Sequence, residues 1–210
     1  PRLRIHPKGP RVGIRASKPD EIWHIDTTLI RLLDGTRVYL HAIIDNFSRR
    51  ILSWRLNEHF DPGISADLLV EAGRGLIADA SPPTLLADGG VENYNGSVDE
   101  VIASGLLRRV LAQTEISFSN SLIEAWWRVL KHSWLFLNQL DSAACVRKLV
   151  AFYVEEHNTR LPHSAFQGQT PDEMYSGTGD EVPDNLRAAR QDARRRRLEV
   201  NRAARCGVCA

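Results

Sequence analysis

The chain has 210 residues, 43% of them apolar, which is enough to bury one hydrophobic core with extensions around it. This composition excludes a disordered polymer. The longest apolar runs, such as residues 149–154, are too short to cross a bilayer, and no basic-then-apolar signal segment opens the chain. We therefore expect a soluble intracellular protein with no membrane partner. Three cysteines are an odd number and do not favour a disulfide framework.

The formal net charge of +1 conceals a segregation of charge along the chain. Residues 1–18 hold six basic residues and no acidic residue, and residues 187–210 hold eight arginines and two acidic residues. The stretch between them holds 13 basic and 24 acidic residues. Basic ends suit contact with a polyanion, because each neutralised phosphate releases counterions. The alternative is that both ends are solvated charge.

The first predicted elements are strands. Three runs rich in β-branched and aromatic residues, at 21–30, 37–45 and 51–57, predict a β-meander with Asp34-Gly35 as its first turn. Further elements are expected, in chain order, as a helix at 64–78, a strand at 84–87, a helix at 98–104, a strand at 107–111, and helices at 121–138 and 141–156.

The last predicted elements are helical. A short helix is expected at Thr170, where a capping threonine, the first-turn Pro171 and Glu173 form a capping box. From residue 185 onward the periodicity is helical but the apolar content is thin, so the order of this tail is expected to depend on partners. Strands followed by alternating strands and helices predict an α/β fold, in which a mixed sheet is flanked by helices.

Three acidic residues stand out against this background. Asp26 lies in an apolar strand, Asp88 directly follows another strand, and Glu124 lies in the first turn of a tryptophan-rich helix. The first two are separated by 61 residues and the last two by 35 residues. Carboxylate oxygens are the ligands that hard divalent cations prefer, and such cations support phosphodiester chemistry. If the three converge in space, they form a metal site.

Each acid also has an ordinary structural interpretation. Asp26 could be a strand-end aspartate exposed to water, and Asp88 before Gly89-Gly90 is usual turn chemistry. Glu124 could reach back to the amide of Ser121 in a capping box. The functional interpretation therefore depends on all three acids together.

The local sequences around these acids carry a family resemblance. They are Trp23 to Asp26, Tyr39 to Trp54, Asp88-Gly89-Gly90, Ser119 to Ser121 with Glu124, Leu130-Lys131, His157 to Arg160, His163-Ser164 and Thr170-Pro171. Together, over about residues 20–176, they resemble the catalytic core of insertion-sequence transposases in the retroviral integrase superfamily. The resemblance implies a ribonuclease H-like fold, a catalytic triad of Asp26, Asp88 and Glu124, and two Mg²⁺ or Mn²⁺ ions. It further implies that Asp26 bridges the two ions, with Asp88 on one and Glu124 on the other.

Candidate DNA-binding residues lie around the triad and after the last core helix. Arg128 and Lys131, four and seven positions after Glu124, share its helical face, whereas Trp126 and Trp127 are expected to diverge from that face into the core. Lys131 matches a lysine that contacts DNA in the family. The resemblance extends the DNA-binding candidates to Asn120, His157, Arg160 and His163.

One residue departs from the family pattern, and one cysteine pair is a separate candidate for metal binding. Glu92 stands where relatives carry a polar amide that contacts DNA, and a fourth acid there would repel phosphate unless it turns away or binds metal. Cys206 and Cys209 have half of a zinc-ribbon spacing, and metal binding there would need ligands from a partner chain.

The sequence thus predicts a transposase catalytic core, residues 19–176, between a basic N-terminal arm, residues 1–18, and a basic C-terminal tail, residues 177–210. Since the chain opens with Pro1 and its single methionine is Met174, we expect a piece of a longer protein whose N-terminal DNA-recognition region is missing. The expected partners are transposon ends, target DNA and further copies of the chain, in the bacterial cytoplasm and on the nucleoid. The alternatives are a ribonuclease H-like nuclease without strand transfer and an inactive DNA-binding remnant.

Overall fold

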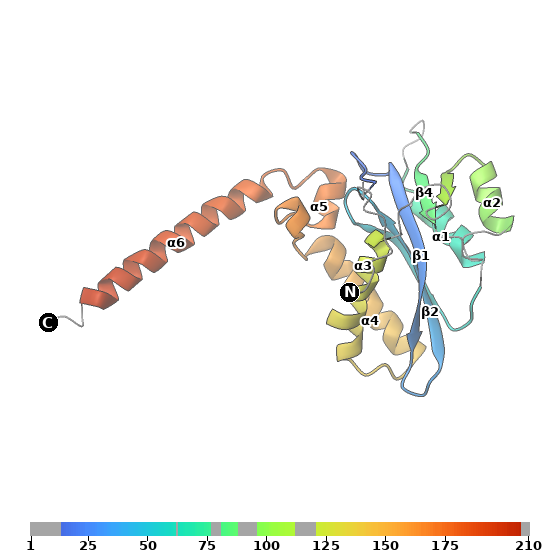
Figure 1. Ribbon diagram of the computed structural model, residues 1–210, viewed down its shortest axis with the longest axis horizontal. Helices are drawn as coiled ribbons and strands as arrows, with labels where there is room; N and C mark the ends of the chain where they lie inside the picture. The colour runs from blue at the N-terminus through green and yellow to red at the C-terminus, as the bar shows by residue number, and fades with distance from the viewer. Residues whose placement is uncertain (1–13, 62, 77–80, 88–95, 112–120, 207–210) are drawn as a thin grey trace, which may run out of the picture. The chain divides into compact units, whose positions relative to one another are not determined.

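The computed structural model describes residues 14–61, 63–76, 81–87, 96–111 and 121–206 (Figure 1). The chain forms two compact units, residues 1–154 and residues 155–210. The boundaries expected at residues 18 and 176 stay predictions. Within the described residues no helix is both long and apolar enough to span a membrane.

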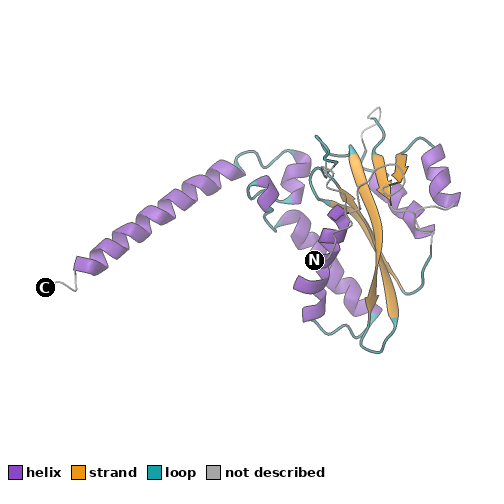
Figure 2. Ribbon diagram, viewed as in Figure 1, coloured by secondary structure: helices purple, strands orange, loops and turns teal. Residues whose placement is uncertain are grey.

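The first unit is built on one mixed sheet in the order β3-β2-β1-β4-β5 (Figure 2). β1 pairs antiparallel with β2, which pairs antiparallel with β3, whereas β4 is parallel to both β1 and β5. The strands are β1 (Ile22–Arg31), β2 (Arg37–Asp45), β3 (Ile51–Asn57), β4 (Thr84–Ala87) and β5 (Arg108–Leu111). The predicted meander is confirmed.

Side chains that alternate along the strands give the sheet two apolar faces. Even-numbered residues of β2, such as Leu40 and Ile44, pack in one cluster with Trp126 and Trp127. Odd-numbered residues of β1 and β2, such as Ile43, pack in a second cluster. Helices cover both apolar faces: Figure 1 shows α3 and α4 on one side of the sheet, and α1 and α2 on the other. Because both faces of β2 are covered, its sequence is largely apolar and almost continuously buried.

The helices of the first unit are α1 (Gly63–Gly73), α2 (Gly96–Ala103), α3 (Ser121–Ser133), the 3-10 turn η1 (Leu135–Leu137) and α4 (Ala143–Thr159), which crosses the unit boundary. The sequence predicts a helix that continues to residue 138, but α3 ends at Ser133. The correction has a packing cause: Leu135 is fully buried, and the Trp134 indole N–H donates to the Leu149 carbonyl of α4 at 2.9 Å. The end of α3 at this point lets the partly buried Trp134 side chain pack against α4, which a continuous helix would carry it past.

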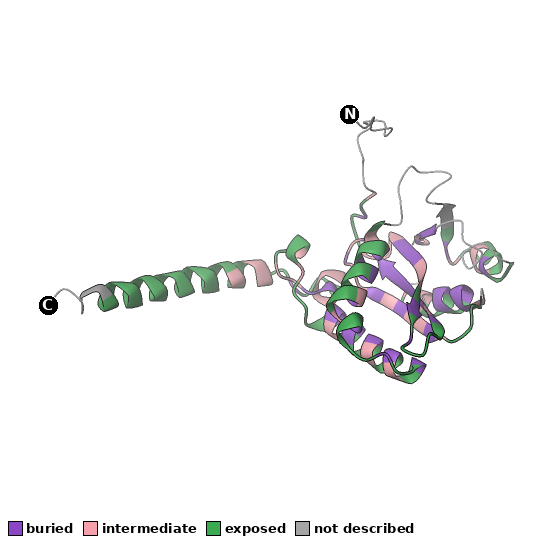
Figure 3. Ribbon diagram, turned by 60° about the horizontal axis from the view of Figure 1, so that its bottom comes forward, coloured by how far each residue is buried: buried purple, intermediate pink, exposed green. Residues whose placement is uncertain are grey.

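The second unit contains η2 (Ser164–Phe166), α5 (Pro171–Ser176) and α6 (Val182–Cys206). The predicted capping box of α5 is confirmed, since the Glu173 amide donates to Thr170 Oγ1 at 3.2 Å and the Thr170 amide donates to Glu173 Oε2 at 2.8 Å. α6 is a single helix of 25 residues, and its side chains from Arg187 to Ala204 are all exposed (Figure 3).

Candidate functional site

The site is centred on Asp26, near the middle of β1. Asp26 shares its sheet face with His24 and Thr28, because successive side chains of a strand alternate. α3 packs on this face, and the Trp127 indole N–H donates to Asp26 Oδ2 at 2.9 Å. Asp26 is half-buried, so this hydrogen bond to a charged acceptor is partly shielded from water. Residues 101 positions apart are thereby joined.

Glu124 lies in the first turn of α3 and is exposed. It precedes Trp127 by three residues, so the two side chains occupy the same stripe of the helix. The capping-box interpretation of Glu124 is not supported, because Ser121 is already within the helix and no hydrogen bond joins the two described residues. A carboxylate in this first turn is stabilised by the positive end of the helix dipole.

Lys131 lies one turn after Trp127 and completes the contact between α3 and β1. Its ammonium Nζ donates to Thr28 Oγ1 at 2.5 Å and to the Leu29 carbonyl oxygen at 3.0 Å. Burial lowers the pKa of Lys131, and the nearby Asp26 carboxylate opposes this by favouring the charged amine. Asp26 therefore has a hydrogen-bond donor on one side and a cation in its neighbourhood.

The expectation that both tryptophans diverge from the site is wrong for Trp127. Its ring packs in the core together with Trp126, as expected, with ring centroids 4.7 Å apart, but its indole nitrogen reaches Asp26. A tryptophan can do both because its body is apolar and its edge carries a donor. The spacing of three from Glu124 and four to Lys131 was the signal that could have identified it.

Four residues of interest lie outside the described residues: Asp88, Glu92, Asn120 and Cys209. β4, which leads directly to Asp88, ends at Ala87. The pairing of β1 with β4 ends at His24 and Leu86, each two positions before Asp26 and Asp88. Within the described part of the chain, no group of three or more His, Cys, Asp or Glu side chains is gathered for a metal. The structure therefore positions two members of the predicted triad.

A buried polar network supports the start of β1. Asn46, in the turn after β2, lies with Nδ2 2.8 Å from His24 Nε2, and its backbone amide donates to the Ile22 carbonyl at 2.9 Å. The fully buried Asp45 accepts the Ser48 amide and hydroxyl, each at 2.7 Å. Burial raises the pKa of Asp45, and the Ser48 hydrogen bonds oppose that rise. The turn and the strand that carries Asp26 are thus tied together.

The remaining DNA-binding candidates belong to both units of the chain. Arg128 is exposed on α3. In the second unit, His157 is buried near the end of α4, and Arg160 forms an ion pair with Glu156 at 3.2 Å. His163 precedes η2, where its Nδ1 accepts the Ala165 amide at 3.3 Å. The last two residues therefore have local structural contacts in addition to the predicted role.

Comparison with protein families gives two matches. Models of the integrase core domain match residues 16–117 and residues 111–171, which together form one continuous stretch of the chain.

Two curated relatives that are named transposases are about one quarter identical to this chain. The transposase for insertion sequence element IS904 of Lactococcus lactis subsp. lactis (strain IL1403) is 25% identical over 164 residues, 75% of this chain and 62% of that protein. Transposase InsF for insertion sequence IS3A of Escherichia coli (strain K12) is 24% identical over 162 residues, 76% of this chain and 55% of that protein. The chain thus spans between 55% and 62% of the length of these relatives.

Solved structures show the same fold. The HTLV-2 integrase catalytic core domain in complex with magnesium, dimeric form, superposes with a TM-score of 0.59 at 18% identity, over 77% of this chain and 99% of that one. A chain of the simian T-cell lymphotropic virus intasome in complex with PP2A regulatory subunit B56 gamma gives a TM-score of 0.62 at 19% identity. The match covers 77% of this chain and 56% of that one. The predicted ribonuclease H-like fold, a mixed sheet flanked by helices, is confirmed.

Proposed function

Because this chain belongs to the integrase core family, we propose that it is a transposase catalytic core that cleaves DNA 3′ ends and joins them to target DNA with divalent metal ions. The observation that carries the proposal is the contact of α3 with β1. Trp127 holds the Asp26 carboxylate, and the same helix carries Glu124 one turn earlier. These two acids are in the local sequences that resemble the family.

Asp88 is proposed as the third member of the site. It directly follows Ala87, the last residue of β4, in the chain, and consecutive Cα atoms are about 3.8 Å apart. β4 is the parallel neighbour of β1, and the strand positions that lead to Asp26 and Asp88 are matched two residues earlier. This supports a shared site for all three carboxylates.

The donor set fits magnesium or manganese. Asp26, Asp88 and Glu124 would supply hard oxygen ligands, and magnesium prefers a few carboxylates together with waters. Two such ions, when bound, stabilise both the attacking and the leaving oxygen of an in-line displacement at phosphorus. The HTLV-2 integrase core, which shares this fold, is a complex with magnesium, and this supports the same choice of metal.

The protein's own groups position this chemistry. The Trp127 indole N–H fixes the orientation of the Asp26 carboxylate, and a partner of this kind typically affects metal affinity or activity about 10- to 100-fold. Lys131 places an ammonium beside β1, where its charge favours the approach of a phosphate. In the proposed reaction, water first cleaves the end of the element, and the freed 3′-hydroxyl then attacks a target phosphodiester. The 3′-oxygen of the target strand leaves.

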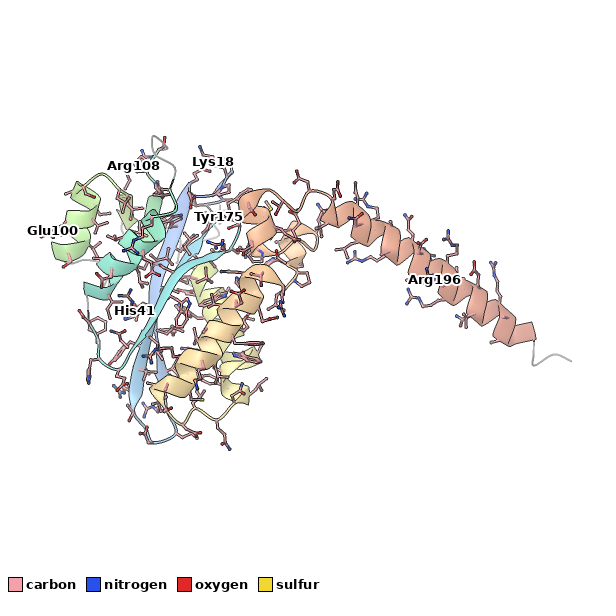
Figure 4. All side chains as sticks on the ribbon, turned by 180° about the vertical axis from the view of Figure 1, so that it is seen from behind. Lys18, His41, Glu100, Arg108, Tyr175 and Arg196 are labelled. Atoms are coloured by element: carbon pink, nitrogen blue, oxygen red, sulfur yellow. The ribbon has the colours of Figure 1, made fainter. Side chains whose placement is uncertain are left out.

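The first test is calorimetric titration of the chain with Mn²⁺ and Mg²⁺. We expect binding to weaken at least about tenfold, or about 1.4 kcal/mol, in Asp26→Asn, Asp88→Asn and Glu124→Gln. The matched control is Glu100→Gln, an exposed carboxylate on α2 that is labelled in Figure 4. Absence of binding, or equal affinity in all variants, would favour an inactive DNA-binding remnant.

The second test separates joining from hydrolysis. With an oligonucleotide that ends in a free 3′-hydroxyl, a transposase core yields joined products, whereas a ribonuclease H-like nuclease yields only shorter ones. We expect joined products with wild type, none with Glu124→Gln, and a rate about 10- to 100-fold lower with Trp127→Phe, which keeps an aromatic ring at this position and removes the N–H donor. Hydrolysis without joining would establish the nuclease instead.

Assembly on DNA is part of the proposal. Joining two ends of an element to one target requires more than one catalytic site, so we infer that several copies act together on DNA. The viral integrase structures of the same fold include a dimeric form and an intasome, and they support this inference.

A further inference from the structure

The second unit contains a hollow of about 830 Å³ between the start of α6 and the segment before α5. Three arginines of α6 line one side, Arg187, Arg190 and Arg194. Ser164 and Gln167 line the other side with a hydroxyl and an amide. The described residues around the hollow include no acidic side chain. Its size is in the range of ligand-binding cavities, and its polar groups suit an anion.

The hollow is built by close packing at one glycine. Gly168 has a φ of +103°, which L residues rarely adopt, and a Cβ added to it would lie 2.2 Å from Leu186 Cδ1. A side chain at this position would displace the Leu186 side chain, so glycine suits both the backbone conformation and the contact with α6. Leu186, itself part of the lining, therefore anchors the helix beside Gln167, and the arginines one turn and more beyond it have a defined place.

The arginines on different faces of α6 differ in whether they have an acidic neighbour. Arg190 and Arg194 have no acidic residue three or four positions away, the spacing at which helical side chains meet. By contrast, Arg195, Arg196 and Arg202 each have Asp192 or Glu199 at that spacing, and Arg195 pairs with Asp192 at 2.8 Å. Arg187 is the partial exception on the hollow side, since it pairs with Asp184 at 2.8 Å. Two of the three arginines that line the hollow, Arg190 and Arg194, thus have no acidic neighbour at helical spacing.

These cations also repel one another. Arg187, Arg190, Arg194 and Arg197 follow at spacings of three and four, and like charges at these spacings destabilise a helix by about 0.2–0.5 kcal/mol per pair. A bound anion would remove this repulsion. From Arg187 to Arg194 the helix rises about 10 Å, at about 1.5 Å per residue, which matches about three steps of 3.4 Å along one DNA strand.

We propose that this hollow binds the sugar-phosphate backbone of DNA, with Arg187, Arg190 and Arg194 on phosphates of one strand and Ser164 and Gln167 as further donors. Guanidinium groups suit phosphate because they donate two parallel hydrogen bonds. The site reads no bases, so it adds affinity and position but no sequence preference. The choice of DNA among polyanions rests on the proposed function, whereas the site itself is independent of the metal centre.

The test is the salt dependence of binding to a short fluorescein-labelled DNA duplex, followed by anisotropy with chelator present and no divalent metal. The triple variant Arg187→Gln, Arg190→Gln, Arg194→Gln is expected to bind about tenfold or more weakly at low salt. Its slope of log K against log salt should be shallower by about 3, at about 0.9 per phosphate contact.

The matched control changes the same number of charges on the other face of α6: Arg195→Gln, Arg196→Gln and Arg202→Gln. Arg196 is labelled in Figure 4. This control should stay within about threefold of wild type, because its arginines are compensated by acids. Equal weakening by both triples would overturn the proposal, since binding would then follow total charge alone. No weakening by the first triple would overturn it as well.

Two further measurements separate the loss of phosphate contacts from misfolding and from a change in assembly. Replacing the same three arginines by lysine keeps the charge and should recover only part of the affinity, because an ammonium cannot donate the two parallel hydrogen bonds of a guanidinium; this partial recovery separates lost contacts from misfolding. Sedimentation without DNA should show the same molecular mass for wild type and the first triple; a fall in mass would identify the hollow as a contact between copies instead. Since this assay contains no metal, intact DNA binding together with an absence of metal binding in the wild-type chain would defeat the proposed function alone.

Discussion

At the scale of single residues, Trp127 and His41 show how one buried side chain can serve two requirements. Trp127 packs its ring in the core and gives its N–H to Asp26. His41, labelled on β2 in Figure 4, is fully buried, with Nδ1 2.7 Å from Thr27 Oγ1. Within the described residues His41 Nε2 has no hydrogen-bond partner. The hydrogen bonds of Trp127 and His41 do not follow from residue type, because each depends on the neighbour that the fold places beside the ring.

The first prediction concerns His41 and pH. Burial lowers the pKa of His41 from 6.5 to about 4, with Asp61 opposing and Arg55 adding to the shift. Because the folded pKa lies below the unfolded one, the stabilisation is fully present above pH 6.5 and is lost as pH falls toward 4. Wild type should lose about 2 kcal/mol more than His41→Phe between about pH 7 and pH 5.

The measurement is urea unfolding of both proteins at each pH. Taking the difference between wild type and His41→Phe removes the contributions of the carboxylates that the two proteins share. Parallel stability curves for wild type and variant would show that His41 is protonated equally in the folded and unfolded states.

At the scale of elements, two similar sequence patterns have different outcomes. Thr170 and Glu173 form a reciprocal capping box, followed by a left-handed Gly177 with φ 67° that ends α5. Ser121 and Glu124 have the same spacing, yet Ser121 lies inside α3 and the carboxylate is exposed. The difference is where the helix begins, which tertiary contacts decide because helix ends are weakly specified by local preferences.

The second prediction concerns this cap. α5 has only six residues, too few to be stable without its termini, so Thr170→Ala should cost about 1 kcal/mol locally. Hydrogen exchange of the amides in Asp172–Ser176 should then accelerate about fivefold. Thr170→Ser keeps the oxygen acceptor and serves as control, with exchange close to wild type. An unchanged rate in Thr170→Ala would mean that packing alone holds α5.

At the scale of the whole molecule, stability is distributed unevenly. The central strands are buried on both faces, whereas the side chains of α6 from Arg187 to Ala204 are exposed (Figure 3). Opening free energies follow the apolar contacts that an element makes. Charge is also distributed unevenly along the chain. The acidic middle carries the proposed metal ligands, and the basic ends suit contact with phosphate.

The third prediction follows from this distribution. Amides of α6 beyond Arg194 should exchange on the order of 100-fold or more faster than those of β1 and β2, and duplex DNA should slow the exchange of α6. Mass spectrometry of exchanged peptides measures both effects. Protection of α6 equal to that of β2 without DNA would mean that the helix has a partner surface of its own.

Much of the fold could be predicted from the sequence because its signals are local. The strands at 37–45, 51–57 and 84–87 have the predicted bounds, since β-branched runs between turn residues leave little choice of ends. The spacing of Asp26, Asp88 and Glu124, together with their neighbouring residues, was enough to identify the family.

Only the tertiary structure decided which side chains surround Asp26. The bond from Trp127 and the anchoring of Lys131 on Thr28 link residues more than 100 positions apart. They depend on how α3 rotates and packs on β1, where about one helical turn decides which side chain meets the carboxylate. The arginine-lined hollow likewise depends on Gly168 meeting Leu186. The sequence therefore determined the elements and the chemical inventory, whereas packing decided the contacts, because a contact is a property of two surfaces and not of one segment.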